Sequence, residues 1–422
     1  MGVLKIATYS SNTRWFTVVT ATTIIASISQ LYGYEKVSPY FFIAGLVAFL
    51  SIAVFMIVRA CLFYKETLNE LINPEKTLYL FTVVVAVSLV GVCFSRIFHL
   101  QTTASVCLYV AIGFWLGISL FSFSILFLHH KSEDREIVNI LHGGWFFVTA
   151  GTQSVAFLGV IVAEHSIIHA IFFQLFSFAL WSIGASLYLI FMTLIIMRLV
   201  FYRFDSNACL SPYWMNVGAA AITALTGSAL YQYINIIGGP FVDFLPFLKG
   251  ISLFFWSFGL WWLPFLIVLA IRKRTSNSEG FAFTVGYWEV ALAIGLYASG
   301  TIQLVGLFKG QYLVILSMCF YFAFIVLWCF SSIFTIVHLV RSSIWMPVND
   351  LTINYAVPYS FKLRGKVFKV KEVINEWLDQ TIEGVLKKRY SVVINDNLAC
   401  QISYDMLTKK WYFDKIENNF RL

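Results

Sequence analysis

The sequence predicts an all-α polytopic membrane protein with ten transmembrane helices, followed by a small α+β domain. Hydrophobic residues make up 59% of the 422 residues and charged residues only 12%, and the mean hydropathy is +0.80. Because soluble globular domains are about a quarter charged, this composition excludes that class. Apolar runs of about 20 residues, the length that a helix needs to cross the hydrocarbon core, recur through residues 1–345.

Ten apolar runs define the expected transmembrane helices. The first run follows a polar start and lacks a small-residue cleavage site, which indicates a retained span and not a signal peptide. An even number of spans places both ends of the chain on the same side of the membrane. The expected spans are 15–32, 39–63, 78–98, 103–128, 143–163, 168–200, 212–236, 244–271, 287–307 and 312–340.

The basic residues are distributed unevenly between the two sides of this topology. The side that holds the chain ends carries Lys5, Arg14, Arg59, Lys65, Lys76, Lys131, Arg135, Arg198, Arg203, Arg272, Lys273, Arg274 and Arg341. The opposite side carries Lys36, Arg96, Lys249 and Lys309. This positive-inside bias predicts a cell-membrane protein with both termini in the cytoplasm. The formal net charge of +8 therefore reports topology, and the expected partner is the lipid bilayer and not nucleic acid.

The sequence lacks motifs for metal binding, catalysis and nucleotide use. Its seven cysteines show no CxxC or Cys/His spacing, so we expect neither disulfides nor a metal site. It contains no Walker motif, and no paired carboxylates or nucleophile–base pair fall at one membrane depth. We therefore expect no enzyme activity and no cofactor. Histidines such as His142 are expected at loops or at the membrane surface.

The expected spans alternate along the chain between large aromatic side chains and small, weakly polar ones. The even-numbered spans are rich in aromatic residues, as in "LFFWSFGLWWLPF", whereas the odd-numbered spans carry small and weakly polar residues. We call these odd-numbered spans lean, and a clear example is Pro212–Tyr233, "PYWMNVGAAAITALTGSALYQY". Bulky aromatic side chains cost nothing against lipid, but small residues either let helices approach closely or leave space.

Two interpretations of the lean spans remain open. Small residues in a single helix are more often a packing seam than the lining of a passage. Five alternating helices that share this texture favour an inner ring of lean helices, inside an outer ring, around a narrow neutral passage. On that interpretation the candidate lining residues are Thr20, Thr23, Ser88, Thr152, Gln153, Asn216, Gly218, Thr223, Gly295 and Ser299.

Residues 346–422 have the mixed, charged composition of a small cytoplasmic α+β domain. Two short strands are expected on either side of the turn at Arg364 and Gly365. Apolar residues at helical spacing then predict a helix over 373–386. Three further strands are expected at 390–394, 399–404 and 411–416. This domain is a candidate site for an unidentified cytoplasmic partner.

Several stretches resemble the tellurite-resistance/dicarboxylate transporter family, which includes the plant guard-cell slow anion channels and belongs to the voltage-dependent anion channel superfamily. The resemblance covers residues 14–345. "SPYWMNVGAAAIT" is similar to the family's Pro-x-Trp-x-x-x-Gly-Ala signature, and "FWSFGLWWLPFLIVLAIRK" to its Trp-x-x-Gly-x-Trp-Trp-x-Pro motif. "RWFTVVTATTI" and "WFFVTAGTQSVA" are similar to its first and fifth spans.

The resemblance implies five helical hairpins in a pseudo-fivefold arrangement, a homotrimer with one pore in each subunit, and small anions as substrates. Family substrates are chloride, nitrate, C4 dicarboxylates, sulfite and tellurite. In the family a phenylalanine followed by proline plugs the pore in the ninth span. Alignment on Trp288 places Leu292 at the plug and Ala293 at the proline. Leu292 is thus the candidate pore gate, with ordinary helix packing as the alternative.

The acidic residues near the spans bear on the mode of transport. Glu164, Asp243 and Glu289 are expected to be interfacial and solvated, so no ionisable residue is expected deep in a lean helix. Passive anion permeation is the simplest mechanism that follows. A proton-coupled dicarboxylate carrier and a transport-inactive sensor or scaffold for the C-terminal domain are the alternatives. Anions would be attracted at the outer mouth by Arg96 and Lys249 and at the inner mouth by Arg272 and Arg274.

Overall fold

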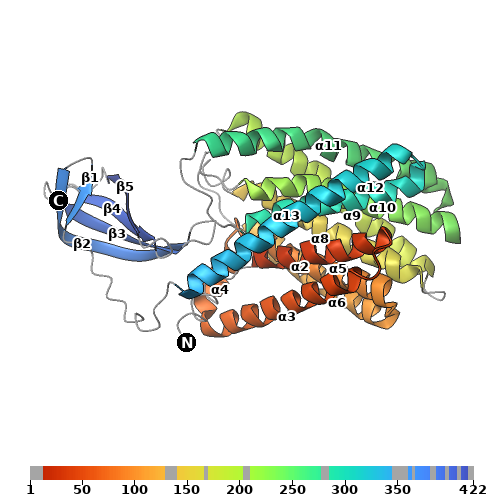
Figure 1. Cartoon of the computed structure of the whole chain (residues 1–422), viewed down its shortest axis with the longest axis horizontal. Coiled ribbons are helices and arrows are strands. Elements are labelled where there is room, and N and C mark those ends of the chain that lie inside the picture. Colours follow the sequence, from red (N-terminus) through yellow and green to blue (C-terminus); the bar gives the residue numbers. More distant parts are fainter. Residues whose placement is uncertain are drawn as a thin grey trace. The chain divides into compact units, whose positions relative to one another are not determined.

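The computed structural model describes residues 13–128, 140–165, 170–202, 210–276, 285–344, 360–363, 366–380, 386–394, 399–405 and 410–416. The chain divides into a helical unit, Asn12–Phe334, and a second unit that contains Thr335–Leu422 (Figure 1). Each unit is described by itself.

Each expected span coincides with one long helix of the described chain. The described residues contain eleven α-helices: α2 (Phe16–Leu31), α3 (Ser38–Leu62), α4 (Tyr64–Ile72), α5 (Phe81–Phe98), α6 (Gln101–Leu128), α8 (Phe146–Ala163), α9 (Ala170–Phe201), α10 (Trp214–Ile237), α11 (Leu245–Ser276), α12 (Gly286–Phe308) and α13 (Gln311–Ile344). Short 3₁₀ turns are η1 (Thr13–Trp15), η2 (Thr77–Leu80), η3 (Gly143–Trp145), η4 (Ser211–Tyr213) and η5 (Val242–Phe244). The short helix α4 was not expected, and its Glu70 pairs with Arg59.

Within the described residues, eight helices are long and apolar enough to cross a membrane. The two remaining expected spans, α2 and α10, do not reach that length or hydropathy. Helix α2 has 16 residues, and α10 is rich in glycine, alanine, serine and threonine. Every residue of α10 from Met215 to Leu230 is buried. A helix whose surface is covered by other helices does not need the hydropathy that lipid contact demands.

The buried fraction of the helices alternates along the chain in the same order as their side-chain size. The most apolar windows of α5, α8 and α12 are 83%, 100% and 72% buried. The corresponding windows of α3, α6, α9, α11 and α13 are only 11%, 17%, 39%, 22% and 17% buried. We call α2, α5, α8, α10 and α12 the lean helices, and α3, α6, α9, α11 and α13 the bulky helices.

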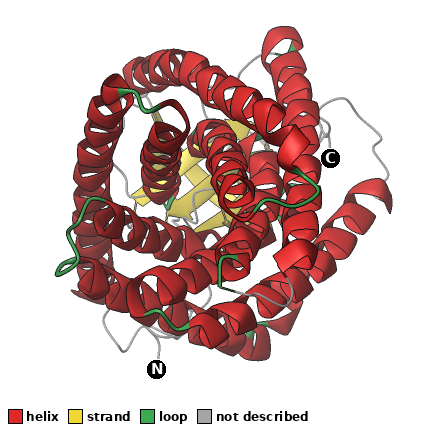
Figure 2. Ribbon diagram, turned by 90° about the vertical axis from the view of Figure 1, so that its right-hand side faces the viewer, coloured by secondary structure: helices red, strands yellow, loops and turns green. Residues whose placement is uncertain are grey.

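The lean helices contact one another in a closed series. Helix α2 packs on α5, α5 on α8, α8 on α10, α10 on α12, and α12 on α2 again. Helices α2, α5, α8 and α10 each also pack extensively on the bulky helix that follows in the chain. Figure 2, turned by 90° from Figure 1, looks along these helices from one end.

Small residues let the backbones of α10 and α12 approach closely. A Cβ atom added to Gly218 would lie 3.2 Å from the Cα of Ala293, and one added to Gly300 would lie 2.9 Å from the carbonyl oxygen of Ala221. Neither neighbour is a flexible side chain that could move aside. Glycine is therefore required at position 300, and position 218 leaves little room for a larger residue.

Tryptophan indoles fasten bulky helices to lean ones. In each case the indole N–H donates a hydrogen bond to an oxygen of a lean helix, so a buried polar group finds its partner within the bundle. The pairs are Trp115 with the Thr152 hydroxyl at 2.9 Å, Trp181 with the Thr223 carbonyl at 3.0 Å, Trp256 with the Thr301 hydroxyl at 2.9 Å, and Trp328 with the Thr22 hydroxyl at 3.1 Å.

The second unit contains a five-stranded antiparallel sheet in the order β1-β2-β3-β4-β5. Its strands are β1 (Ser360–Leu363), β2 (Lys366–Gln380), β3 (Leu386–Ile394), β4 (Ala399–Asp405) and β5 (Lys410–Ile416). The two strands flanking 364–365 and the three C-terminal strands lie where the sequence predicts them.

The helix expected over 373–386 is wrong, because its first half belongs to β2 and Leu386 begins β3. Register shifts between Val370 and Glu372 and between Val373 and Asn375 interrupt the pairing of β2 with β3. Each extra residue shifts the two-residue alternation, so the apolar positions of this strand recur at the spacing of a helix. Pairing with β3 decides that this segment forms a strand and not a helix, and the spacing of apolar residues along the chain does not reveal that pairing.

The α10–α12 seam predicts a large effect of one methyl group. Gly300→Ala should lower the stability of the helical unit by about 1–3 kcal/mol, because its Cβ would press on a backbone carbonyl. Gly113→Ala on α6 is the matched control, since nothing lies within 4 Å of an added Cβ there. Thermal unfolding in detergent measures both; equal midpoints for the two variants would contradict the seam.

Candidate functional site

The first turns of the lean helices meet at one end of the helical unit. Four lean helices are preceded by a 3₁₀ turn, η1 before α2, η2 before α5, η3 before α8 and η4 before α10. These turns contact one another in the order η1–η2–η3–η4, and α12 packs on η4. The amino-terminal end of a helix carries a partial positive charge, so five such ends make this region electropositive.

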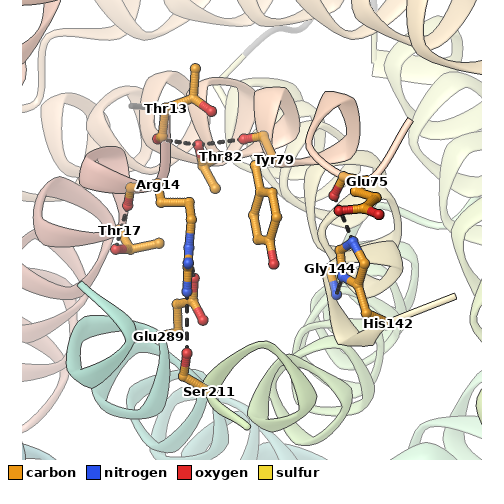
Figure 3. Close-up of polar contacts among 10 residues, drawn as sticks. All are labelled: Thr13, Arg14, Thr17, Glu75, Tyr79, Thr82, His142, Gly144, Ser211 and Glu289. Atoms are coloured by element: carbon orange, nitrogen blue, oxygen red, sulfur yellow. Dashed lines mark hydrogen bonds and ion pairs between the residues drawn. The ribbon is translucent and has the colours of Figure 1, made fainter. Parts of the chain in front are cut away.

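A buried ion pair joins two of these first turns (Figure 3). The Nε of Arg14, in η1, donates to the Oε1 of Glu289, in α12, at 2.7 Å, and the two side chains are 7% and 0% exposed. An Nη nitrogen of Arg14 also donates to the Ser211 hydroxyl of η4 at 3.2 Å. Among the described residues the second carboxylate oxygen, Oε2 of Glu289, is buried and has no hydrogen-bond partner.

Two aromatic rings extend this cluster from Arg14. The guanidinium carbon of Arg14 lies 5.0 Å from the ring centroid of Tyr79, and the Tyr79 ring stacks on His142 at 5.5 Å (Figure 3). The Nδ1 of His142 accepts a hydrogen bond from the Gly144 amide at 2.9 Å. Its Nε2 therefore carries the proton and donates to the Glu75 carbonyl at 2.6 Å.

Burial lowers the pKa of His142 to about 4, and the positive charges of Arg14 and Arg198 act in the same direction, against the hydrogen bond to Glu75. The imidazole is thus neutral at physiological pH and serves as a cap and a stacking partner. Arg198 lies over the Tyr213 ring and donates to its hydroxyl.

The expectation that Glu289 is interfacial and solvated is wrong. The 3₁₀ turns and their mutual contacts carry the packed interior past the first turn of α12, so the carboxylate is fully buried. Arg14, read from the sequence only as a topology signal, is buried with it. A signal was present, because Arg14 precedes Trp15 just before α2, Glu289 follows Trp288 in the first turn of α12, and the two charges are opposite.

The candidate gate, Leu292, is fully buried in α12. It lies one helical turn beyond Glu289, and Leu296 follows on the same face one turn further. Glu289, Leu292 and Leu296 thus form a stripe at the spacing i, i+3, i+7. Its role as a gate stays a prediction.

Several candidate lining residues pack against neighbouring helices. A Cβ on Gly218 would meet α12, as described above, and one on Gly295 would meet the Phe324 ring of α13 at 2.7 Å. Contacts with bulky helices are those of Thr152 with Trp115, of Gln153 with the Trp181 carbonyl at 3.0 Å, of Asn216 with the Tyr188 hydroxyl at 2.7 Å, and of Thr23 with the position of Gly45. These contacts match the packing interpretation that the sequence left open.

The side-chain hydroxyls of the other candidate lining residues bond within their own helix or, among the described residues, have no partner. Thr20, Thr223 and Ser299 donate to carbonyls of their own helices, those of Thr17, Ala219 and Gly295. The Ser88 hydroxyl is buried, with no partner in the described part of the chain. A lining role for these residues stays a prediction.

The basic residues expected at the mouths lie near helix ends. Arg96 is in the last turn of α5, and its guanidinium lies 5.3 Å from the Phe157 ring centroid. Lys249 is near the start of α11, and its ammonium lies 4.9 Å from the Phe308 ring centroid. Arg272 is exposed at the end of α11, and the side chain of Arg274 lies outside the described residues. In the carboxyl-terminal parts of α10 and α12, Gln303 donates to the Gln232 side chain at 2.9 Å.

The described residues contain no group of histidine, cysteine and acidic side chains that could hold a metal ion. What the structure assembles is a multi-pass helical bundle with buried charges at one end, an architecture that is typical of membrane transport proteins.

The chain belongs to the voltage-dependent anion channel family, whose model matches residues 12–336. It is similar to the uncharacterized transporter MJ0576 of Methanocaldococcus jannaschii, with 23% identity over 333 residues that cover 76% of this chain and 91% of that protein. It is also similar to the sulfite efflux pump SSU1 of Trichophyton rubrum, with 22% identity over 340 residues, or 74% of this chain and 87% of the pump. The family resemblance read from the sequence is thereby confirmed.

The buried neutral state of His142 predicts an acid-sensitive fold. A histidine with a pKa of about 4 in the folded chain and an ordinary value near 6.5 when unfolded contributes stability above pH 6.5 that is lost as the pH falls toward 4. The loss is at most about 3 kcal/mol. His142→Asn keeps an acceptor for the Gly144 amide and removes the titrating ring. Unfolding midpoints in detergent between pH 6.5 and 4 should fall more steeply for the natural chain, and parallel slopes would contradict this role.

Proposed function

We propose that the chain is a channel for the passive permeation of small anions, through a narrow passage enclosed by the five lean helices. The single observation that carries the proposal is the closed series of contacts α2–α5–α8–α10–α12 among the buried helices. On this proposal all ten long helices cross the membrane as five hairpins, and α2 and α10 are short or lean because bulky helices separate them from lipid.

The electropositive end of the lean helices supports an anionic substrate. Arg14 and the five helix amino termini lie at this end, and the distribution of basic residues assigns it to the cytoplasmic side of the cell membrane, with both chain termini. The family and the name of the fungal relative, a sulfite efflux pump, agree with a small anion. Chloride, nitrate, C4 dicarboxylates and oxyanions similar to tellurite are the candidates.

Leu292 is the proposed gate of this passage. It is fully buried and lies one turn from the charged end, on the same face of α12 as Glu289. An apolar side chain in a narrow passage can block ions by excluding water. The hydroxyls of Thr20, Ser88 and Ser299 are proposed to replace part of the hydration of the anion.

Flux measurements in liposomes test the proposal. The purified full chain should carry chloride, nitrate or malate, and Leu292→Ala should raise the flux about tenfold, the change that ~1.4 kcal/mol off the barrier produces. Leu120→Ala, at a side chain on α6 that is 71% exposed, is the matched control and should leave flux unchanged. Flux absent from the natural chain and from the Leu292 variant would favour the transport-inactive sensor or scaffold instead.

Glu289 favours proton-coupled dicarboxylate transport as a second candidate function. A buried ionisable residue in a membrane helix is the usual requirement of a coupled carrier, and Glu289 meets it. In the same liposomes, a pH gradient alone would then drive malate accumulation against its concentration gradient. Dissipation without accumulation would leave passive permeation as the mechanism.

A further inference from the structure

We propose that Arg96 is the outer binding site for the permeating anion, and that this site takes oxyanions in preference to halides. The inference rests on the proposed function and adds to it a binding residue and a substrate class. Arg96 lies in the last turn of α5, at the opposite end of the lean helices from the ion pair of Arg14 with Glu289. The sequence predicts only a general attraction of anions by Arg96, whereas the contacts of this side chain suit it to direct binding.

Helix geometry places Arg96 on the inner side of α5. Two residues earlier, Phe94 packs its ring on Phe42 of the bulky helix α3, with the ring centroids 4.9 Å apart. Because successive residues of a helix are about 100° apart, Arg96 projects in nearly the opposite direction. Its guanidinium carbon lies 5.3 Å from the ring centroid of Phe157, on the neighbouring lean helix α8. The side chain is therefore directed toward the axis of the lean helices and away from the bulky ones.

Phe157 lies on the inner side of α8. Two residues further along, Gly159 faces the bulky helix α9, because a Cβ added there would lie 2.4 Å from the Ser177 hydroxyl. Phe157 thus projects away from α9. Its ring is buried and held by packing, so it gives the Arg96 guanidinium a fixed apolar surface that attracts a cation.

The N–H donors of the Arg96 side chain have no partner within the described part of the chain. Arg96 makes no side-chain hydrogen bond or ion pair there, and its contact with Phe157 uses the charge and none of the donors. The end of α5 does not use them either. The Leu100 amide bonds to the Phe94 carbonyl at 3.0 Å, and His99 ends the helix in the left-handed conformation. The guanidinium thus keeps its donors for a ligand.

The charges at this end of the lean helices require a cation if anions are to pass. The carboxyl end of a helix carries a partial negative charge, and the carboxyl ends of the lean helices lie here. Glu164, which follows α8, acts on Arg96 through space, but it is exposed and makes no ion pair with it. Both features repel an anion. Arg96 offsets this repulsion on the inner side, where the anion would pass.

A guanidinium whose donors are available distinguishes between anions. It is a planar fork that matches two oxygens of a carboxylate or nitrate, whereas a halide offers a single centre. Arg96 is also partly buried, which strengthens its interaction with an anion relative to an arginine in bulk water. Nitrate and acetate should consequently bind better than chloride.

Anion binding to the purified full chain tests the inference, with the rise of the unfolding temperature in nitrate, acetate or chloride as the readout. Arg96→Gln removes the charge and the fork, so it should weaken nitrate and acetate binding about tenfold, the effect of one lost charge-assisted hydrogen bond. Lys36→Gln is the matched control. Lys36 is exposed in the connection between α2 and α3, at the same end of the lean helices, and its loss should leave nitrate affinity unchanged.

Arg96→Lys separates direct binding from general attraction. Lysine keeps the positive charge but lacks the planar fork. This variant should bind chloride as the natural chain does, and nitrate and acetate several-fold more weakly. Three unchanged affinities would mean that Arg96 acts through its charge alone, and the inference would be wrong.

Two further results would overturn the inference. Nitrate affinity equal to that of the natural chain in Arg96→Gln, even with a lower unfolding temperature, would mean that Arg96 only stabilises the end of α5. Equal weakening in Lys36→Gln and Arg96→Gln would mean that any positive charge at this end has the same effect. If Arg96→Gln does not fold, the nitrate and acetate affinities of Arg96→Lys decide the question by themselves.

The binding assay is independent of transport, so the two proposals fail separately. Absent flux in the natural chain and in Leu292→Ala refutes permeation, whatever the anion affinities. Flux that is present, with the same half-saturating nitrate concentration in Arg96→Gln and in the natural chain, refutes the outer site and leaves permeation intact.

Discussion

The close packing of the lean helices on one another is the constraint on which the rest of the structure depends. Backbones approach closely only where side chains are small, as Gly300 shows against the carbonyl of Ala221. The bulky helices cover the lean helices and expose large apolar side chains in their place. The indoles of Trp115, Trp181, Trp256 and Trp328 satisfy their N–H groups by bonding to the lean helices, which ties the two sets together.

This packing also explains why charge is gathered at one end of the helical unit. The first turns of the lean helices contact one another, so polar side chains there are removed from water and must find partners within the protein. Arg14 finds Glu289 and Ser211, and His142 bonds through both ring nitrogens. The same turns direct their helix dipoles to one region. A structural requirement and an attraction for anions thus arise from one arrangement.

Much of the fold could be predicted from the sequence, because apolar runs and their alternation in texture are local properties. The candidate site was less accessible. Candidate lining residues such as Asn216 and Gly295 contact α9 and α13, and an orientation of this kind depends on how each helix is rotated about its axis. The register shifts in β2 likewise gave a strand the apolar spacing of a helix.

The sequence by itself determined the class of the protein, the positions of its long helices and the division into lean and bulky ones, because hydropathy and side-chain size are written into each segment. Only the tertiary structure decided which helices touch, that Glu289 is buried, and that it pairs with Arg14 across 275 positions of the chain. Burial and ion pairing are properties of neighbours in space, and no window along the chain contains both partners.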